Sequence, residues 1–190
     1  MTRLLFLLLF VLVGVAALLG IKSCQEARHP VISAPAQDFG GKVAILGDGT
    51  PIFAPNGTIA RALADWLADP KSTRRYFEVG GRQFVGHTDE PTPETRARMT
   101  RLVAMLAGSP AVKVEIVGHA AASGNPAADM ALSHAHAERA RAMLVEEGIS
   151  ADRLSVSTRG AGQPLPGLRP DDPRNDRIGL LMTAPDRPAD

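Results

Sequence analysis

The chain has 190 residues, 45% of them hydrophobic, and its 21 Lys and Arg nearly balance its 20 Asp and Glu, giving a formal net charge of +1. This balance excludes the ordinary electrostatic route to nucleic-acid binding, which needs clustered basic residues to displace counterions. The single cysteine, Cys24, excludes an intramolecular disulfide, so the fold must be stabilised by packing.

An apolar segment near the N-terminus predicts a membrane helix. After Met1-Thr2-Arg3, residues 4–21 are 18 consecutive uncharged and mostly apolar positions. As a helix that rises about 1.5 Å per residue, this segment spans roughly 27 Å, close to the thickness of a hydrocarbon core, about 30 Å. We therefore expect residues 1–22 to be an uncleaved signal anchor, so that the protein crosses the membrane once.

Two alternatives for this segment stay open. A cleaved signal peptide is one, although its apolar region is usually only about 7–15 residues long and ends at a small-x-small site. A lipoprotein anchored at Cys24 is the other, although Lys22 lies where small residues are usual. Every version exports the rest of the chain. The few flanking charges, Arg3 against Lys22 and Arg28, do not set the orientation.

Residues 23–75 are predicted to form a membrane-proximal linker that contains one short helix. The first part is rich in Pro, Gly, Ala and Asp, with one β-like run at 43–46 and turn residues at 47–51. The helix is expected at 58–68, because Thr58 is a good N-cap, apolar residues recur on one face, and Asp69-Pro70 ends the pattern. Trp66 lies on the apolar face and is interpreted as a packing anchor, with contact to the membrane surface as the alternative.

The folded domain is predicted to cover residues 76–184. Short β-like runs at 76–79 and 83–85 flank Gly80-Gly81. A helix opens at Thr92-Pro93, with proline at the first helical position, and ends at residues 108–110. Its apolar face, defined by the 3.6-residue period, consists of Met99, Leu102, Val103 and Leu106.

The second half of this domain continues the alternation of strands and helices. Apolar and charged residues alternate at 112–117, which predicts a strand with one buried face. A long helix around Leu132-Ser133 follows and ends at Gly148, and strands are expected at 154–158 and from 175 onward. The order β-α-β-α-β-β is typical of a two-layer α+β sandwich, with a small mixed sheet and helices on one face. The predicted helix seam is Leu132, His136, Ala140, Met143 and Leu144, and the tail 185–190 is expected to be loose.

This domain contains four short motifs, each at or beside a predicted strand or helix. They are Gly118-His119 after the central strand, Leu132-Ser133 in the long helix, Gly160-Ala161-Gly162 after the next strand, and Asn175-Asp176-Arg177-Ile178 at the last strand. They resemble the Gly-His-Thr-Asp, Asn-x-x-Leu-Ser-x-x-Arg-Ala, Gly-x-Gly-Glu-x-x-Pro and Asn-Arg-Arg-Val motifs of the OmpA-like family, the peptidoglycan-associating module of bacterial envelopes. The resemblance implies an α+β domain in the periplasm, attached to the inner membrane through residues 4–21.

The resemblance also implies where a ligand would bind. In the family, the aspartate of the first motif and the arginine of the helix motif clamp the zwitterionic end of a diaminopimelate, through charge-assisted contacts. Here these two positions hold Ala121 and His136, and the asparagine of the helix motif is Asp129. Each lost contact is worth about 1.5–3 kcal/mol, so muropeptide binding is expected to be weakened. The other pocket positions implied by the resemblance are His119, Asn175 and Arg177.

A second copy of the family tetrapeptide, Gly86-His87-Thr88-Asp89, precedes the first helix of the domain. If it forms a loop near the ligand pocket, new charges could replace the lost clamp. The alternative is a solvated loop whose acids merely cap the next helix. A rebuilt pocket of this kind would draw its carboxylates from Asp89, Glu90 or Asp129 and its cation from His136 or Arg139.

The sequence carries no pattern for catalysis, metal binding or a cofactor. It lacks Gly-x-Ser-x-Gly, His-Glu-x-x-His and phosphate-loop motifs. His134 and His136 are two positions apart on a helix and point in nearly opposite directions, which is poor geometry for a shared metal. A metal site from His87, His119 and His136 is the alternative. We therefore expect no catalytic residue, no metal and no cofactor.

Two hypotheses for function follow from these patterns. In the first, a membrane-anchored periplasmic protein associates with peptidoglycan and tethers the membrane to the wall without catalysis. In the second, the scaffold has exchanged muropeptide binding for a protein partner in an envelope complex. The residues at positions 121 and 136 favour the second for direct binding, whereas the family resemblance favours the first.

Overall fold

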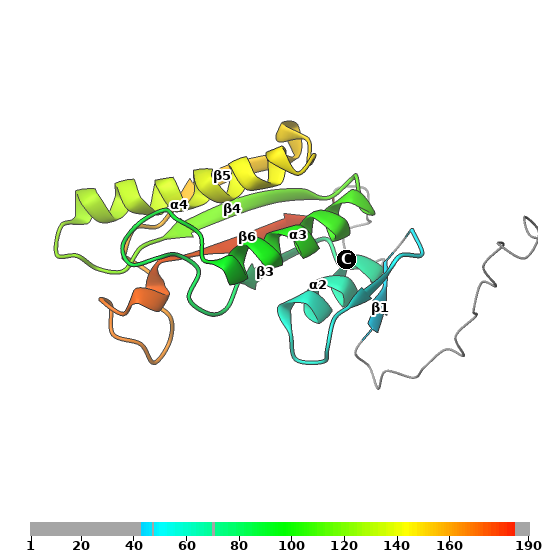
Figure 1. Ribbon diagram of the computed structural model, residues 1–190, viewed down its shortest axis with the longest axis horizontal. Coiled ribbons are helices and arrows are strands. Elements are labelled where there is room, and N and C mark those ends of the chain that lie inside the picture. Colours follow the sequence, from blue (N-terminus) through cyan, green and yellow to red (C-terminus); the bar gives the residue numbers. More distant parts are fainter. Residues whose placement is uncertain (1–42, 47, 70, 185–190) are drawn as a thin grey trace, which may run out of the picture. The chain divides into compact units, whose positions relative to one another are not determined.

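The computed structural model describes residues 43–46, 48–69 and 71–184, and Figure 1 labels its helices and strands. Within these ranges, no helix is both long enough and apolar enough to cross a membrane. The predicted anchor at 1–22, the alternative lipid site at Cys24 and the predicted loose tail at 185–190 all lie outside the described residues.

A mixed sheet of four strands forms the centre of the fold, in the order β3-β6-β4-β5. Strand β6 runs antiparallel to both β3 and β4, while β4 and β5 are parallel. From β3 onward the chain alternates β-α-β-α-β-β, as predicted, and the α+β fold is confirmed. The bounds of the strands in this sheet are Arg74–Glu78 (β3), Lys113–His119 (β4), Leu154–Thr158 (β5) and Arg177–Thr183 (β6).

Three helices and a small hairpin complete the described part of the chain. The hairpin pairs β1 with β2 in antiparallel register. Single turns of 3-10 helix precede β5 and β6, at Ala151–Arg153 and Pro173–Asn175. The remaining bounds are Val43–Ile45 (β1), Pro51–Phe53 (β2), Ile59–Ala68 (α2), Pro93–Ala107 (α3) and Pro126–Glu146 (α4).

Local sequence explains where the two long helices begin and end. The side chain of Thr92 accepts a hydrogen bond from the third residue of α3, and the side chain of Asn125 accepts two from the start of α4. Both helices have proline at the first helical position, where its missing N–H is not needed. Beyond α4, Gly148 has a φ of +96°, a left-handed conformation that ends helices and favours glycine.

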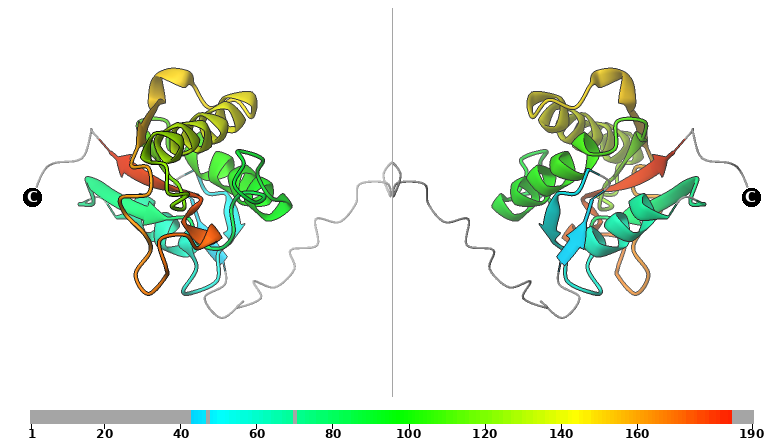
Figure 2. Two further views of the ribbon diagram at one scale, coloured as in Figure 1. Left: turned by 90° about the vertical axis from the view of Figure 1, so that its left-hand side faces the viewer. Right: turned by 90° about the vertical axis from the view of Figure 1, so that its right-hand side faces the viewer.

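The core lies between one face of the sheet and the helices (Figures 1 and 2). Alternate residues of a strand point to the same face. On β6 these are Ile178, Leu180 and Met182, and on β4 they are Val114 and Ile116, all buried in one hydrophobic cluster. The helices add buried residues to this cluster, among them Met99, Leu102, Met105 and Leu106 from α3 and Ala137, Ala140 and Leu144 from α4.

The predicted seam of α4 is wrong at Leu132, which is only half-buried. Ser133 and Ala137 face the sheet instead, at the point where α4 crosses Gly118 of β4. A Cβ at Gly118 would lie 1.8 Å from the carbonyl oxygen of Ser133, so only glycine lets the helix come this close. Helical period alone could not show which small residues would mark that contact.

The segment before β3 packs on the same core. Leu46, Leu63 and Trp66 belong to the hydrophobic cluster of the sheet. Trp66 meets Phe77 of β3 edge to face, with ring centroids 6.0 Å apart and an interplanar angle of 78°. Part of the predicted linker at 23–75 is therefore packed structure. It includes a hairpin whose first strand matches the β-like run predicted at 43–46 and whose second strand was not predicted.

Candidate functional site

Four segments meet at the carboxyl end of β4, where the pocket was predicted. They are the end of β4 itself, the first half of α4, the start of β6, and residues 85–90, which connect Phe84 to Pro91. Short contacts between side chains and backbone join all four segments. The site is thus assembled from parts of the chain that lie far apart in sequence.

His136 of α4 lies at the centre of this site and is fully buried. Its Nδ1 is 2.8 Å from the carbonyl oxygen of His119, and its Nε2 is 2.9 Å from the carbonyl oxygen of Thr88. The ring also stacks on Phe84, with centroids 3.9 Å apart. Both ring nitrogens therefore face carbonyl oxygens, and a neutral imidazole has one N–H to donate, so it can satisfy only one of these two contacts.

A buried carboxylate faces the same site from the residue just before β6. Oδ1 of Asp176 accepts a hydrogen bond of 2.8 Å from the backbone N–H of Ala121, and the side chain is fully buried. Its Oδ2 lies 2.9 Å from Nδ1 of His87 but accepts no well-aligned hydrogen bond. This second contact is therefore a close approach and not a formed hydrogen bond, because the distance is short while the alignment is poor.

Residues 85–90 form a tight, exposed turn over these two groups. Its base is an isolated bridge between Phe84 and Pro91, beside which the N–H of Thr92 donates to the carbonyl of Gln83 at 3.0 Å, so the predicted β-like run at 83–85 is not a full strand. Inside the turn, the N–H of Val85 donates to the carbonyl of Glu90 at 2.9 Å. Gly86 has a φ of +56°, the left-handed conformation that such a turn needs.

Two of the predicted pocket residues, Asp129 and Asn175, hold neighbouring loops in place through side-chain hydrogen bonds. The carboxylate of Asp129 accepts hydrogen bonds from the backbone N–H and the hydroxyl of Ser123. The side chain of Asn175 accepts from the N–H of Leu165 and donates to the carbonyls of Arg169 and Pro170. Both side chains are buried, and their contacts fix the loops that flank the site.

His119 and Arg177 form a separate buried polar cluster with β3. The guanidinium of Arg177 meets the carboxylate of Glu78 at 3.0 and 3.3 Å, and Nε2 of His119 lies 3.0 Å from the hydroxyl of Tyr76. Burial, with a further contribution from the charge of Arg177, lowers the pKa of His119 from 6.5 to about 4. Burial, then the nearby Glu78 carboxylate, raises the pKa of Tyr76 to about 12. Both side chains are therefore neutral at physiological pH.

The remaining predicted residues are not brought together. Asp89 and Glu90 are exposed on the turn, and the side chain of Glu90 reaches only to Arg96, at 4.0 Å. Arg139 lines a different surface hollow, beside α3. Across the described residues, no group of three or more His, Cys, Asp or Glu side chains is arranged to hold a metal ion.

Sequence reasoning missed Asp176 and Phe84 as parts of the site, and it named His87 only within the possible pocket loop at 86–89 and as a possible metal ligand. A signal for Asp176 was present, because the chain replaces an acid with Ala121 in one motif and a base with Asp176 in another. The carboxylate of Asp176, just before β6, lies against the backbone N–H of residue 121 at the end of β4. The role of His87 depends on how the turn folds back, which no local pattern reveals.

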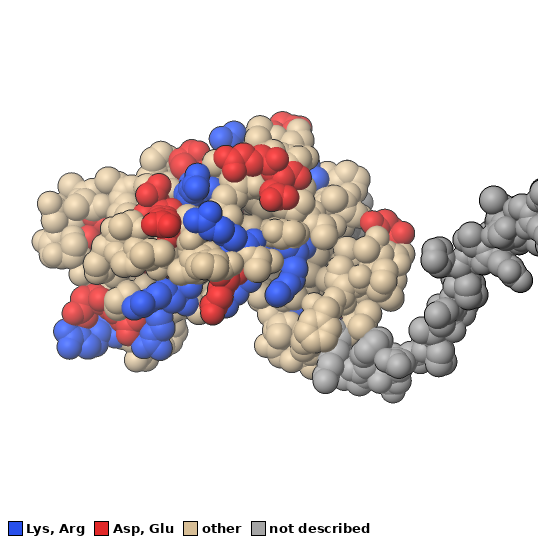
Figure 3. Space-filling view, in the orientation of Figure 1, with Lys and Arg blue, Asp and Glu red and all other residues tan. Residues whose placement is uncertain are grey.

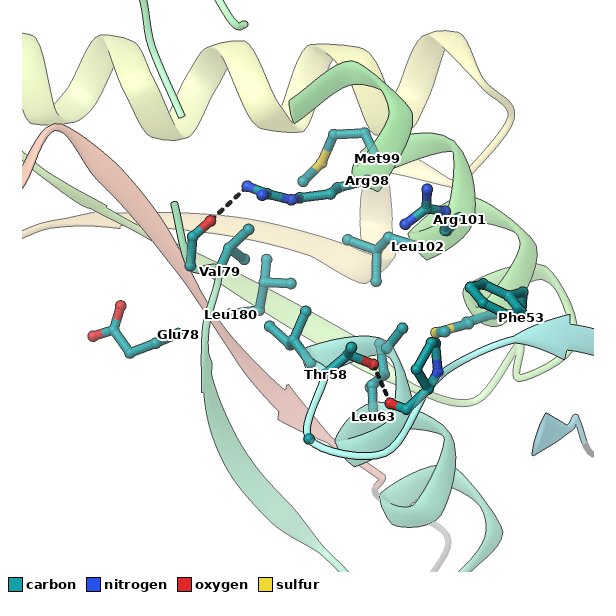
Figure 4. Close-up of a pocket in the computed structure, with 16 residues that line it drawn as sticks. Phe53, Thr58, Leu63, Glu78, Val79, Arg98, Met99, Arg101, Leu102 and Leu180 are labelled. Carbon is teal, nitrogen blue, oxygen red and sulfur yellow. Dashed lines mark hydrogen bonds between the residues drawn. The ribbon is translucent and has the colours of Figure 1, made fainter. Parts of the chain in front are cut away.

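A cavity of about 550 Å³ lies elsewhere, between α2, α3 and the sheet. Figure 4 shows Leu63, Leu102 and Leu180 gathered around it, while Arg98 reaches the carbonyl of Gly80. On the face shown in Figure 3, acidic and basic side chains are interspersed. That face thus lacks the basic patch that a nucleic acid would need.

Comparisons with known proteins agree with this architecture. A family model described as the OmpA family matches residues 76–177. The OmpA-like domain of FopA1 from Francisella tularensis subsp. tularensis SCHU S4 matches with a TM-score of 0.50 and 16% identity, over 58% of this chain and 72% of that chain. The periplasmic domain of MotB from Helicobacter pylori matches with a TM-score of 0.50 and 15% identity, over 60% and 75%.

A third structure, the peptidoglycan-associated lipoprotein from Burkholderia pseudomallei, matches with a TM-score of 0.47 and 21% identity, over 63% of this chain and 100% of that chain. At these identities, the likeness to solved structures shows the fold alone. No curated protein sequence matches the chain.

Proposed function

The chain belongs to the OmpA family, whose model covers more than half of its length, and from this we propose that it is a non-catalytic envelope protein that associates with peptidoglycan. The expected ligand is the diaminopimelate end of a peptide stem. This end carries an ammonium and a carboxylate on one carbon, so it needs an anion and a cation close together in its site.

Two buried side chains that each contact the end of β4, Asp176 and His136, carry this proposal. The carboxylate of Asp176 lies against the backbone of Ala121, and the ring of His136 lies against the backbone of His119. An acid and a base are thus both held at the end of β4, although the residues implied by the resemblance are absent. Asp176 would take the ammonium, and His136 would take the carboxylate.

The place of the protein in the cell is part of the proposal. Residues 1–22 would anchor the protein in the inner membrane and leave the OmpA-like domain in the periplasm. The 18-residue apolar run supports this anchor. The likeness to a structure described as a periplasmic domain supports the orientation. A lipoprotein attached at Cys24 is the alternative anchor.

A second candidate function is that of a protein-binding scaffold without muropeptide binding. Ala121 is buried, and Nε2 of His136 already has the carbonyl of Thr88 as a partner. Neither group is free to meet a ligand while residues 85–90 stay in place. These contacts favour a closed surface that another envelope protein could recognise.

Sedimentation with peptidoglycan sacculi separates the two functions. The full chain in detergent micelles should sediment with sacculi, and Asp176→Asn should weaken binding by about 10- to 100-fold, as expected for one lost charge-assisted contact. The introduced amide keeps an oxygen for the N–H of Ala121, so the variant removes charge with little change in shape. Asp65→Asn, which alters an exposed acid of α2, is the matched control and should bind like wild type.

The outcome at wild type decides between the two candidates. If the wild-type chain does not sediment with sacculi at any concentration, peptidoglycan association is wrong and the scaffold hypothesis replaces it. If both aspartate variants bind like wild type, the chain binds the wall but not through Asp176.

A further inference from the structure

The turn over the candidate site places the imidazole of His87 against the buried carboxylate of Asp176. It also places the carbonyl oxygen of Thr88 against the buried ring of His136. We propose that residues 86–89, called the tip loop from here on, are a displaceable internal ligand of the Asp176–His136 site. This inference rests on the function proposed above and concerns how the same site is regulated.

The tip loop occupies the site in place of a ligand through two contacts, the first of which joins His87 to Asp176. The imidazole of His87 lies 2.9 Å from Oδ2 of Asp176, the position that the ammonium of a ligand would take. The carboxylate is fully buried, and Oδ2 has no aligned hydrogen-bond donor among the described residues. A buried carboxylate oxygen without such a donor is costly, so a better donor than His87 would be favoured there.

The second contact joins Thr88 to His136. The backbone carbonyl of Thr88 lies 2.9 Å from Nε2 of the buried ring, the position that the carboxylate of a ligand would take. A carboxylate is a stronger acceptor than a backbone carbonyl for a ring N–H. A zwitterionic ligand would therefore improve both contacts at once, whereas a diamine or a dicarboxylate could improve only one.

The tip loop is built so that it can leave without disturbing the fold. All residues from 85 to 90 are exposed, whereas Gln83 and Phe84 at its base are buried. The turn is closed on itself by the bond from Val85 N–H to the carbonyl of Glu90 and by the bond from the hydroxyl of Thr88 to the carbonyl of Val85. Among the described residues, its tip is therefore tied to the site only by the two contacts above.

A site that is mostly filled by its own loop binds its ligand less tightly. The apparent dissociation constant equals the intrinsic one divided by the fraction of open molecules, so any change that weakens the closed loop should tighten binding. The ligand class follows from the two contacts: a compound that carries an ammonium and a carboxylate on one carbon.

Two variants weaken the closed loop in independent ways. His87→Ala removes the imidazole from Asp176. Gly86→Ala places a side chain at a φ of +56°, which strains the turn although no atom lies within 4 Å of the new Cβ. Val85→Ala is the control, because it shortens an exposed side chain of the same turn and keeps its backbone bonds. Each of the two loop variants should bind meso-diaminopimelate about 3- to 10-fold more tightly than wild type.

Calorimetric titration of the full chain in detergent micelles measures these affinities. The probes are meso-diaminopimelate, pimelate and cadaverine, which carry both charged groups, only carboxylates and only ammoniums, respectively. We expect a gain in affinity for meso-diaminopimelate in both loop variants, none in Val85→Ala, and no comparable gain for pimelate or cadaverine.

Other results would overturn the inference. Equal or weaker binding of meso-diaminopimelate by both loop variants means that the tip loop is part of the binding surface and not its occupant. A gain that is the same for pimelate or cadaverine means that the zwitterion is not what the site recognises. If no protein binds meso-diaminopimelate while wild type sediments with sacculi, the tip-loop inference is wrong and the proposed function stands. If wild type also fails to sediment, both are wrong.

Discussion

His119 illustrates at the level of one residue how the fold sets a protonation state. Its ring is buried, contacts the hydroxyl of Tyr76, and lies close to the positive charge of Arg177. Burial and the neighbouring cation both disfavour the imidazolium, which is why the pKa of His119 falls to about 4. The histidine of the Gly-His motif is therefore a neutral structural residue in this chain.

The lowered pKa of His119 predicts a loss of stability in weak acid. Between pH about 6.5 and about 4, the unfolded chain binds a proton at His119 and the folded chain does not, so the free energy of unfolding falls as the pH decreases through this window. The full shift corresponds to about 3 kcal/mol. Denaturant unfolding of wild type and His119→Gln at pH 7 and pH 4.5 measures it, and an equal loss in both proteins would contradict the prediction.

The candidate site shows what single residues reveal in a sequence. His136 and Ala121 were placed in the pocket by their motif positions, and contacts to both lie in the site. In the sequence, Asp176 was only a departure from a motif. Its place in the site depends on the pairing of β6 with β4, which brings its carboxylate to Ala121. The closing contact of His87 spans 89 residues of sequence, from position 87 to 176, and only the folded chain creates it.

At the level of elements, α4 approaches β4 closely at Gly118. The strand carries no side chain there, and the backbone of α4 at Ser133 fills the space. Ala137 lies one turn later and is also small and buried. The glycine of the Gly-His motif thus sets the distance between helix and sheet, and with it the position of His136.

Gly118→Ala is expected to destabilise the protein strongly. Its Cβ would lie 1.8 Å from a backbone carbonyl oxygen, so α4 must shift, at a cost of about 3 kcal/mol or more. Gly80→Ala is the matched control, because nothing lies within 4 Å of a Cβ there and no left-handed φ is required. Thermal unfolding followed by circular dichroism compares the two, and similar melting temperatures would show that α4 adapts easily.

Elements with strong local signals could be predicted, and those without could not. The starts of α3 and α4 carry proline and capping side chains. Strands β4 and β6 have seven residues each, which is long enough for a strand to be recognised in the sequence. The β-like run at 43–46 is confirmed as β1, whereas its partner β2 has three residues and is defined by pairing rather than by pattern. The residues of α4 that face the sheet were misjudged because tight packing at Gly118 selects small residues over Leu132.

For the described part of the chain as a whole, the segment before β3 is part of the folded unit. Trp66 is 2% exposed and packs on Phe77, in a cluster that also contains residues of α3, β4 and β6. The division into a linker up to residue 75 and a domain from residue 76 stays a prediction about function. In packing, the two parts share one core.

Trp66→Ala tests whether that shared core unfolds cooperatively. Removing a fully buried tryptophan is expected to lower the free energy of unfolding by about 3–5 kcal/mol, in a single transition for the whole domain. Val145→Ala on the exposed side of α4 is the control and should change stability by less than about 0.5 kcal/mol. Circular dichroism is the measurement, since the only tryptophan is lost. A small effect of Trp66→Ala would show that α2 is an independent attachment.

The attachment of the protein to a membrane is the last property to test, and its prediction rests on the apolar residues 4–21. If they form a signal anchor, the full chain should stay in the membrane pellet after a carbonate wash, and Cys24→Ser should behave in the same way. Replacing Val11 and Val13 by Arg places two charges near the middle of the segment, each costing about 2.5–3.5 kcal/mol, and should release the protein from the pellet. Loss of membrane retention in Cys24→Ser, with the apolar segment intact, would instead identify a lipid-anchored protein. A soluble form cut after about residue 24 would show that the apolar segment is only an export signal.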